Sequence, residues 1–243
     1  MTVMTTKEIT SSLERRALQV QRGGARAAVL GVNDGLVSVL CIVIGVAAAG
    51  TDAKHVLLAG FAGLIAGAIS MAAGEWISVK AQVELFEGVL ADVKQAVRDN
   101  REVLTKDLAK SLEKSGIDAK TALHAAKDVA RSDDKLTTMY SAEVIGINDE
   151  ELGSPWVAAW SSFALFTAGA IAPLAPWVLG MEGLAGIMVA VLLTSVGALF
   201  VGGYAANSSG KNIGFGAVRQ LLIVIFAALV TYGIGHIFGV ATS

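Results

Sequence analysis

Five long apolar segments constrain the fold of this chain more than any other feature of its sequence. Each is longer than the roughly 20 residues that an α-helix needs to cross a bilayer. They cover residues 27–50, 56–79, 156–179, 183–206 and 216–239. In hydrocarbon every backbone N–H and C=O must be paired within the protein, so isolated spanning segments form helices. The sequence therefore predicts an all-α membrane protein with five transmembrane helices.

The charged residues are concentrated between the second and third spans. Only 16% of the 243 residues are charged, whereas an average soluble domain has about 25%. The segment 80–154 alone contains 11 of the 19 Lys and Arg residues and 15 of the 21 Asp and Glu residues. We therefore expect four parts: an N-terminal segment (1–26), two spans (27–79), a polar insertion (80–154) and three further spans (155–243).

The insertion has the hydrophobic periodicity of helices, and three are expected. Residues 80–114 carry apolar side chains at helical spacing. Asp118 is predicted to cap a second helix over about 119–131, and Asp133 a third over about 134–145. No helix breaker separates the second span from the insertion, so one helix is expected to continue from one into the other.

Lysine and arginine residues near the span ends predict the topology. Connections on the cytoplasmic side of a membrane carry an excess of these residues. Here they gather before the first span, at the start of the insertion and between spans four and five, at Arg15, Arg16, Arg22, Arg26, Lys80, Lys211 and Arg219. The N-terminus and the insertion are therefore expected in the cytoplasm, and the C-terminus outside.

Two carboxylates lie within the spans, and a methionine accompanies them. Asp34 is in the first span, and Glu75 is in the second, one turn after Met71. A charged side chain at the centre of a membrane helix costs about 2.5–3.5 kcal/mol on insertion scales, so it persists mainly where it serves a cavity, a partner or an ion. Counting from Arg26 and Lys80 at 1.5 Å per residue puts Asp34 and Met71 at about the same depth.

These three residues predict a path for a divalent transition metal, because thioether sulfur favours such metals over magnesium or calcium. Glu75 would stand at the cytoplasmic mouth, with Asp34 and Met71 deeper. Each has a structural alternative: Asp34 could bond a neighbouring helix, Glu75 could reach the interface, and Met71 could be ordinary packing. Small residues beside them would let helix backbones approach closely: Gly31, Gly35, Gly63, Gly67 and Gly74.

The insertion contains a second candidate metal-binding set. Glu84 and Glu87 form an acidic edge, and Met139 and Glu143 are a thioether–carboxylate pair one turn apart. Oxygen together with soft sulfur suits ferrous iron better than magnesium or calcium. The alternative is a solvated amphipathic face, which the lysines and arginines interspersed among these acids favour.

Three stretches of the chain resemble motifs of the vacuolar iron transporter family. The run from Arg26 to Ser38, which contains Asn33-Asp34-Gly35, resembles the first-span motif. The run from Ala59 to Gln82, with Met71 and Glu75, resembles the second. The third is similar to a stretch that comprises Gly153-Ser154-Pro155-Trp156, Gly169-Ala170, Pro173 and Pro176.

The resemblance implies a five-span homodimer whose translocation path lies between the subunits. Asp34 and Met71 would line that path, and Glu75 would mark its cytoplasmic entrance. It further implies export of cytosolic Fe²⁺, often with Mn²⁺, in exchange for protons. A bacterial-type member would export the metal across the plasma (inner) membrane.

The insertion departs from the family pattern in its acidic residues. The resemblance leads us to expect a glutamate-rich first cytoplasmic helix and a further glutamate on the last one. Apolar or basic residues stand there instead: Ala91, Val93, Lys94, Ala96 and Val144. The metal-gathering role of the insertion is therefore in doubt, although transport through the membrane would not require it.

Other functional classes find less support in the sequence. The net charge of −2 and the lack of a basic stripe argue against nucleic acid. The three histidines lack zinc-ligand spacing, no catalytic acid–base set is visible, and we expect neither an enzyme nor a cofactor. The main alternative to a transporter is a metal-responsive membrane sensor or scaffold without transport. A flux measurement separates the two, because a sensor would bind metal and move none.

Overall fold

The computed structural model describes residues 24–147 and 153–242, with side chains for 29–147 and 153–239. Residues 1–23 of the predicted N-terminal segment and the side chain of Arg26 therefore lie outside the described residues. The chain divides into two compact units. We call the part up to Trp76 and from Pro155 onward the membrane unit, and the part Ile77–Ser154 the insertion unit.

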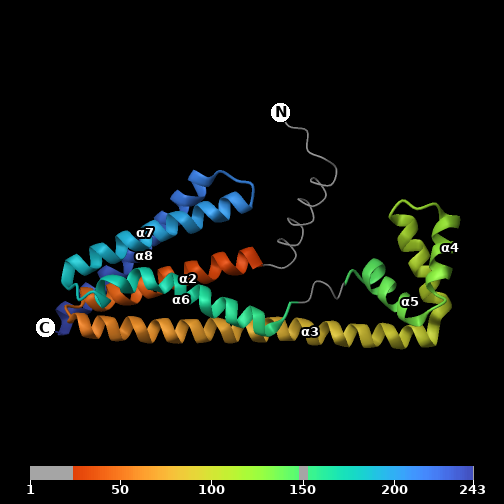
Figure 1. Ribbon diagram of the computed structural model, residues 1–243, viewed down its shortest axis with the longest axis horizontal. Coiled ribbons are helices and arrows are strands. Elements are labelled where there is room, and N and C mark those ends of the chain that lie inside the picture. The colour runs from red at the N-terminus through yellow and green to blue at the C-terminus, as the bar shows by residue number, and fades with distance from the viewer. Residues whose placement is uncertain (1–23, 148–152, 243) are drawn as a thin grey trace. The chain divides into compact units, whose positions relative to one another are not determined.

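Five helices of the described residues are long and apolar enough to cross a membrane (Figure 1). They are α2 (Gly24–Ala48), α3 (Ala53–Lys114), α6 (Pro155–Val178), α7 (Gly183–Ser208) and α8 (Ile213–Thr242). Both ends of the other four helices and the start of α3 lie within a few residues of the predicted spans. Helix α3 continues well beyond the second span, and the short helices of the insertion follow it. The predicted fold class is therefore confirmed.

Helix α2 packs against α6, α7 and α8 and is the central helix of the membrane unit. Its contact with α6 is a close approach of two backbones. A Cβ added at Gly35 would overlap the carbonyl oxygen of Phe166, and one added at Gly169 would overlap that of Val32. Small residues permit this approach in a bilayer, where tight van der Waals packing between helices replaces much of the hydrophobic driving force.

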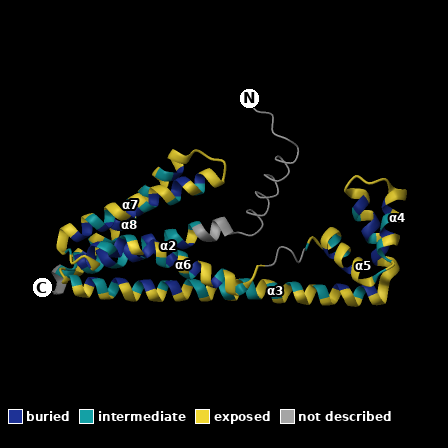
Figure 2. Cartoon of the chain, viewed as in Figure 1, coloured by how far each residue is buried: buried dark blue, intermediate teal, exposed yellow. Residues whose placement is uncertain are grey.

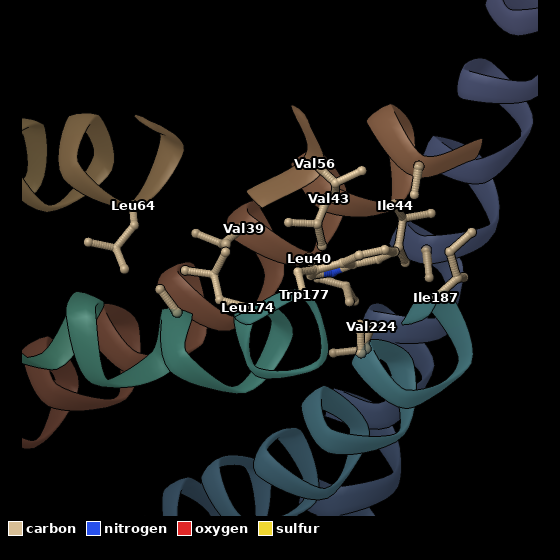
Figure 3. Close-up of a cluster of buried hydrophobic side chains, with 14 of the residues drawn as sticks. Val39, Leu40, Val43, Ile44, Val56, Leu64, Leu174, Trp177, Ile187 and Val224 are labelled. Atoms are coloured by element: carbon tan, nitrogen blue, oxygen red, sulfur yellow. The ribbon is translucent and has the colours of Figure 1, made fainter. Parts of the chain in front are cut away.

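A cluster of buried apolar side chains holds the helices of the membrane unit together (Figures 2 and 3). Residues of α2 form its centre, and every other spanning helix contributes. The labelled members in Figure 3 are Val39, Leu40, Val43, Ile44, Val56, Leu64, Leu174, Trp177, Ile187 and Val224. The packing fixes the positions of the helices that carry Asp34 and Met71.

The insertion unit contains the rest of α3, then α4 (Ala119–Val129), α5 (Asp133–Tyr140) and the π-helix η1 (Ser141–Ile145). Helix α3 continues from the second span into the insertion, as predicted. Its backbone leaves helical geometry at Asn100 (φ −138°, ψ 39°), which the periodicity did not reveal. A separate apolar core holds these helices together, with Val97, Leu108, Ala122, Ala126 and Leu136 fully buried.

One of the two predicted helix caps of the insertion is confirmed and the other is wrong. The Asp118 side chain accepts hydrogen bonds from the backbone N–H groups of Lys120 and Thr121, as an N-cap does. The cap of α5 is Ser132, whose backbone is extended, and not Asp133. Asp133 is the first helical residue, and its carboxylate pairs with Arg101 of α3.

The third predicted helix also changes its type before it ends. Residues 134–145 were expected to form one α-helix, but the last turn widens into η1. The N–H of Ile147 then bonds to the carbonyl of Ser141, and Gly146 ends the segment with φ of 79°. Single π turns of this kind are rare in proteins, and those that occur are often found at functional sites.

Candidate functional site

Asp34 lies on α2, half-buried, at the level where α2 and α6 are closest. Its Oδ1 accepts a hydrogen bond of 2.8 Å from the hydroxyl of Ser38, one turn further along the helix. An ionised carboxylate has about four lone-pair positions. Ser38 occupies one of them, so the carboxylate retains acceptor capacity for a cation. The sequence prediction did not assign Ser38 to the site.

The contacts between α2 and α3 set the relative height of Asp34 and Met71. A Cβ added at Gly63 of α3 would overlap the side chain of Ile42 on α2. Asp34 is eight residues before Ile42, and Met71 is eight residues after Gly63. Because the two helices run antiparallel, both steps lead in the same direction by about 12 Å. This register brings Asp34 and Met71 to about the same height.

Phe166 of α6 lies between α2 and α3 beside this level. Its carbonyl oxygen faces Gly35, and its ring lies against Gly67, where a Cβ would overlap it. The Phe166 side chain is 1% exposed. The ring therefore gives the candidate site an apolar wall, and charges interact more strongly in apolar surroundings than in water.

Met71 and Glu75 occupy one side of α3, one turn apart. Met71 is half-buried and packs against the apolar cluster of the membrane unit. Glu75 is also half-buried. The next residue, Trp76, makes an edge contact with Trp156, with ring centroids 5.8 Å apart. Tryptophans are enriched at membrane–water interfaces, so this contact agrees with a position of Glu75 near the membrane surface.

An amide pair beside Asp34 was not predicted from the sequence. The side-chain nitrogen of Gln220, on α8, donates a hydrogen bond to the side-chain oxygen of Asn33. Gln220 is buried, with 9% of its surface exposed. A glutamine within an apolar span was a visible signal, because polar side chains there commonly bond across helices. Its partner was not visible, since the two residues are 187 positions apart.

The candidate residues of the insertion do not gather into one site. Glu84 pairs with Lys80 at 3.3 Å, and Glu87 is exposed. Met139 and Glu143 are exposed as well, while the Glu143 backbone carbonyl accepts a hydrogen bond from Ser111. Among residues 24–147 and 153–242, no three His, Cys, Asp or Glu side chains lie close enough together to hold a metal ion.

Two groups outside the spans have shifted pKa values. The backbone N–H of His55 and then its side chain bond to Asp52 and lower the pKa of that carboxyl below its usual value of 3.8. In the insertion unit, burial raises the pKa of Tyr140, and the charge of Asp107 adds to that effect. Neither group is near the carboxylates of the spans in sequence.

Comparison with known proteins gives consistent matches over most of the chain. Residues 25–236 match a family model described as the VIT family. The chain is 30% identical to a vacuolar iron transporter of Acanthamoeba castellanii, over 88% of this chain and 78% of that protein. It is 34% identical to vacuolar iron transporter homolog 2 of Arabidopsis thaliana, over 88% and 84%. It is 33% identical to vacuolar iron transporter homolog 1 of Oryza sativa subsp. japonica, over 88% and 73%.

Proposed function

This chain belongs to the VIT family, a family of transporters and not of enzymes, and we propose its function from this premise. We propose that it exports Fe²⁺, and with it Mn²⁺, from the cytosol in exchange for protons. One observation carries the proposal beyond family membership. The contact of Gly63 on α3 with Ile42 on α2 supports about the same height for a carboxylate and a thioether among the spanning helices. A hard oxygen and a soft sulfur together suit a divalent transition metal.

In the proposed path, metal enters at Glu75 and moves to Asp34 and Met71. Glu75 is the first of these side chains that a cation meets on its way from the cytoplasmic surface. Asp34 then supplies charge, and Met71 supplies a polarisable sulfur. The hydroxyl of Ser38 holds one carboxylate oxygen of Asp34, which orients the other toward the cation.

Exchange for protons follows from the chemistry of a carboxylate ligand. A carboxyl group must lose its proton before it binds a metal, so metal and proton compete for the same oxygen atoms. Metal that binds Asp34 from the cytoplasmic side would displace a proton. A proton that arrives from the opposite side would release the metal.

A homodimer with the path between its subunits is part of the proposal. Helix α3 presents apolar side chains at a spacing of three to four residues, on the helix that carries Met71. These exposed residues are Leu58, Phe61, Ile65 and Ile69. A second copy that covers this stripe would close the path from lipid. Cross-linking of single cysteines along the stripe in membranes would test the arrangement.

We also propose the orientation that the charges predict, with the insertion in the cytoplasm and the C-terminus outside. In a bacterial cell the membrane would be the plasma (inner) membrane. Lys211, between α7 and α8, would then face the cytoplasm, and Lys54, at the start of α3, would face the opposite side. Labelling of cysteines at these two positions with an impermeant reagent would distinguish the orientations.

Proteoliposomes loaded with a metal-sensitive dye test the function directly. Native protein should carry Fe²⁺ at a rate that depends on a pH gradient. Asp34→Ala and Met71→Leu should both lose most of that flux while they keep a native elution profile. Metal binding without flux in the native protein would instead support a sensor or scaffold. Uptake by Asp34→Asn that still follows the pH gradient would contradict the proton-exchange mechanism.

A further inference from the structure

The amide pair of Asn33 and Gln220 ties α2 to α8 one residue away from Asp34. Gln220 donates through its side-chain nitrogen to the side-chain oxygen of Asn33. Both residues belong to the membrane unit, and Gln220 is buried there. A buried amide keeps its partner because separation would leave polar groups without hydrogen bonds in apolar surroundings.

Helix α7 packs against α8 at Gln220 and limits where that residue can lie. A Cβ added at Gly202 of α7 would lie 2.7 Å from the Cβ of Gln220 and 2.5 Å from the carbonyl oxygen of Gly216. The backbones of α7 and α8 therefore touch where the Gln220 side chain begins. A displacement of Gln220 away from α2, toward α7, would require these two helices to separate.

Contacts around α2 show which neighbour each of its faces meets. Gly35 faces α6, since a Cβ there would overlap Phe166. Leu36 faces α7, where its Cδ2 lies 3.0 Å from the Cβ position of Gly197. Asn33 faces α8.

Asp34 points in a fourth direction from α2, different from those of Asn33, Gly35 and Leu36. Consecutive residues of an α-helix point about 100° apart around its axis. Asp34 therefore lies about 100° from Gly35 on one side and about 100° from Asn33 on the other. Near Asp34, the contacts with α6, α7 and α8 lie on other sides of α2, and the half-buried Asp34 side chain lies between the directions of Asn33 and Gly35. Further along α2, the same side of the helix approaches α8, where a Cβ added at Gly45 would lie 3.9 Å from the carbonyl oxygen of Thr231.

We propose that the hydrogen bond between Asn33 and Gln220 fixes the rotation of α2 about its axis and thereby aims the Asp34 carboxylate into the metal path. This inference rests on the proposed function, in which Asp34 binds the transported cation. Asn33 and Gln220 are positioning residues. Neither touches the metal, and each acts through the orientation of α2.

A set of near-isosteric variants distinguishes positioning by the Asn33–Gln220 hydrogen bond from a role in stability alone. Asn33→Leu and Gln220→Met each leave one buried amide without its partner, so both should lower the Tm. Combining the two substitutions removes both polar groups, and the Tm should recover in large part. If the bond only stabilises the fold, transport by the double variant should recover as well.

Positioning predicts that the double variant stays impaired although it is stable. We expect its half-saturating Fe²⁺ concentration in proteoliposomes to rise about tenfold, by comparison with enzyme active sites, where a misplacement of about 1 Å can cost about 100-fold. The exchange variant Asn33→Gln/Gln220→Asn keeps two amides and should regain most of the native affinity. Thr194→Val is the control, because Thr194 is fully buried and its hydroxyl has no hydrogen-bond partner within the described part of the chain.

The outcome that overturns the inference is a stable double variant with the native half-saturating concentration. Asp34→Asn, measured in the same vesicles, separates this result from failure of the proposed function. If Asp34→Asn transports like the native protein, Asp34 does not bind the metal and the proposed function fails.

The orientation itself can be tested without any flux measurement. In a Cys41→Ala background, Asp34→Cys is labelled with a small thiol reagent, with the amide pair intact or replaced by Leu and Met. A labelling rate that changes several-fold supports the positioning role. An unchanged rate contradicts it, whatever the transport experiments show.

Discussion

Ser38 donates a hydrogen bond of 2.8 Å to Oδ1 of Asp34 across one turn of α2. The two residues lie on the same side of the helix, because positions four apart are neighbours on a helix surface. The hydroxyl fixes the rotamer of the only carboxylate in the first span. The contact predicts a role for Ser38 other than packing, and removal of its hydroxyl oxygen tests that role.

Ser38→Ala removes that oxygen and leaves the fold unchanged. The Asp34 carboxylate would then sample more rotamers, and each binding event would have to order it. We expect the half-saturating Fe²⁺ concentration to rise several-fold, in line with a net contribution of about 0.5–1.5 kcal/mol for one hydrogen bond. The measurement is the concentration dependence of flux in proteoliposomes.

Ser161→Ala is the matched control for this prediction. The Ser161 hydroxyl bonds only to the carbonyl of Ala158 in its own helix, among the contacts of the described residues. Flux should not change in this variant. A native concentration dependence in Ser38→Ala would show that the hydrogen bond has no part in metal binding.

Gly35→Ala is expected to be the most destabilising single-methyl change near the site. The new Cβ would overlap the carbonyl oxygen of Phe166, and backbone cannot yield as a flexible side chain would. Overpacking typically costs about 1–3 kcal/mol. Thermal unfolding in detergent should therefore show a clearly lower Tm.

Gly233→Ala provides the comparison within α8. Nothing among the described residues lies within 4 Å of a Cβ added at Gly233. Alanine also favours a helix over glycine by about 0.5–1 kcal/mol, so the Tm should hold or rise. Equal Tm values for the two variants would contradict the close contact between α2 and α6.

The spans were predictable from sequence because one property, apolar length, decides them in a bilayer. Helix α6 begins at Pro155, one residue before the predicted span, and proline is favoured in the first turn of a helix. The insertion was harder, because its helix ends depend on competing local interactions. Ser132 caps α5 instead of Asp133, whose carboxylate is engaged by Arg101 from a distant part of α3.

Some features of the candidate site can likewise be predicted from nearby residues in the sequence, and others depend on residues far away in the chain. Depth counting predicted the common height of Asp34 and Met71, and the bond from Ser38 could have been deduced from its spacing of four. The partner of Asn33 could not, because nothing local points to Gln220 in the last span. The orientation that we propose for Asp34 depends on the packing of α6, α7 and α8, which no periodicity reveals.

Asp52 should stabilise the start of α3 in a manner that depends on pH. Its carboxylate accepts hydrogen bonds from the backbone N–H of His55 at 2.9 Å and from the His55 ring at 2.7 Å. These bonds lower the pKa of Asp52 below 3.8, its value in an unfolded chain. The stabilisation is therefore fully present above pH 3.8 and is lost as the pH falls through the lower folded-state pKa.

The measurement is the Tm difference between the native protein and Asp52→Ala as a function of pH. It should be constant from neutral pH down to 3.8 and shrink below that value. Asp52→Asn is the control, because asparagine also caps a helix start and carries no titrating group. A difference that grows in acid would contradict the assigned hydrogen bonds.

Met71→Leu separates the contribution of sulfur from that of side-chain volume. Leucine has a similar size, so the packing of Met71 against the apolar cluster should be kept at a cost below about 1.5 kcal/mol. Removal of the thioether leaves oxygen ligands, which suit Mn²⁺ relatively better than softer metals. We therefore expect Fe²⁺ flux to fall by more than Mn²⁺ flux, so that their ratio shifts several-fold toward Mn²⁺.

Met188→Leu is the natural control for this substitution. Met188 lies on α7 and is 62% exposed, so the same change there should leave both fluxes as they are. Competition of the two metals in one vesicle preparation measures the ratio without reference to protein yield. An equal loss of both fluxes in Met71→Leu would assign Met71 to packing, and Asp34 would then hold the metal without sulfur.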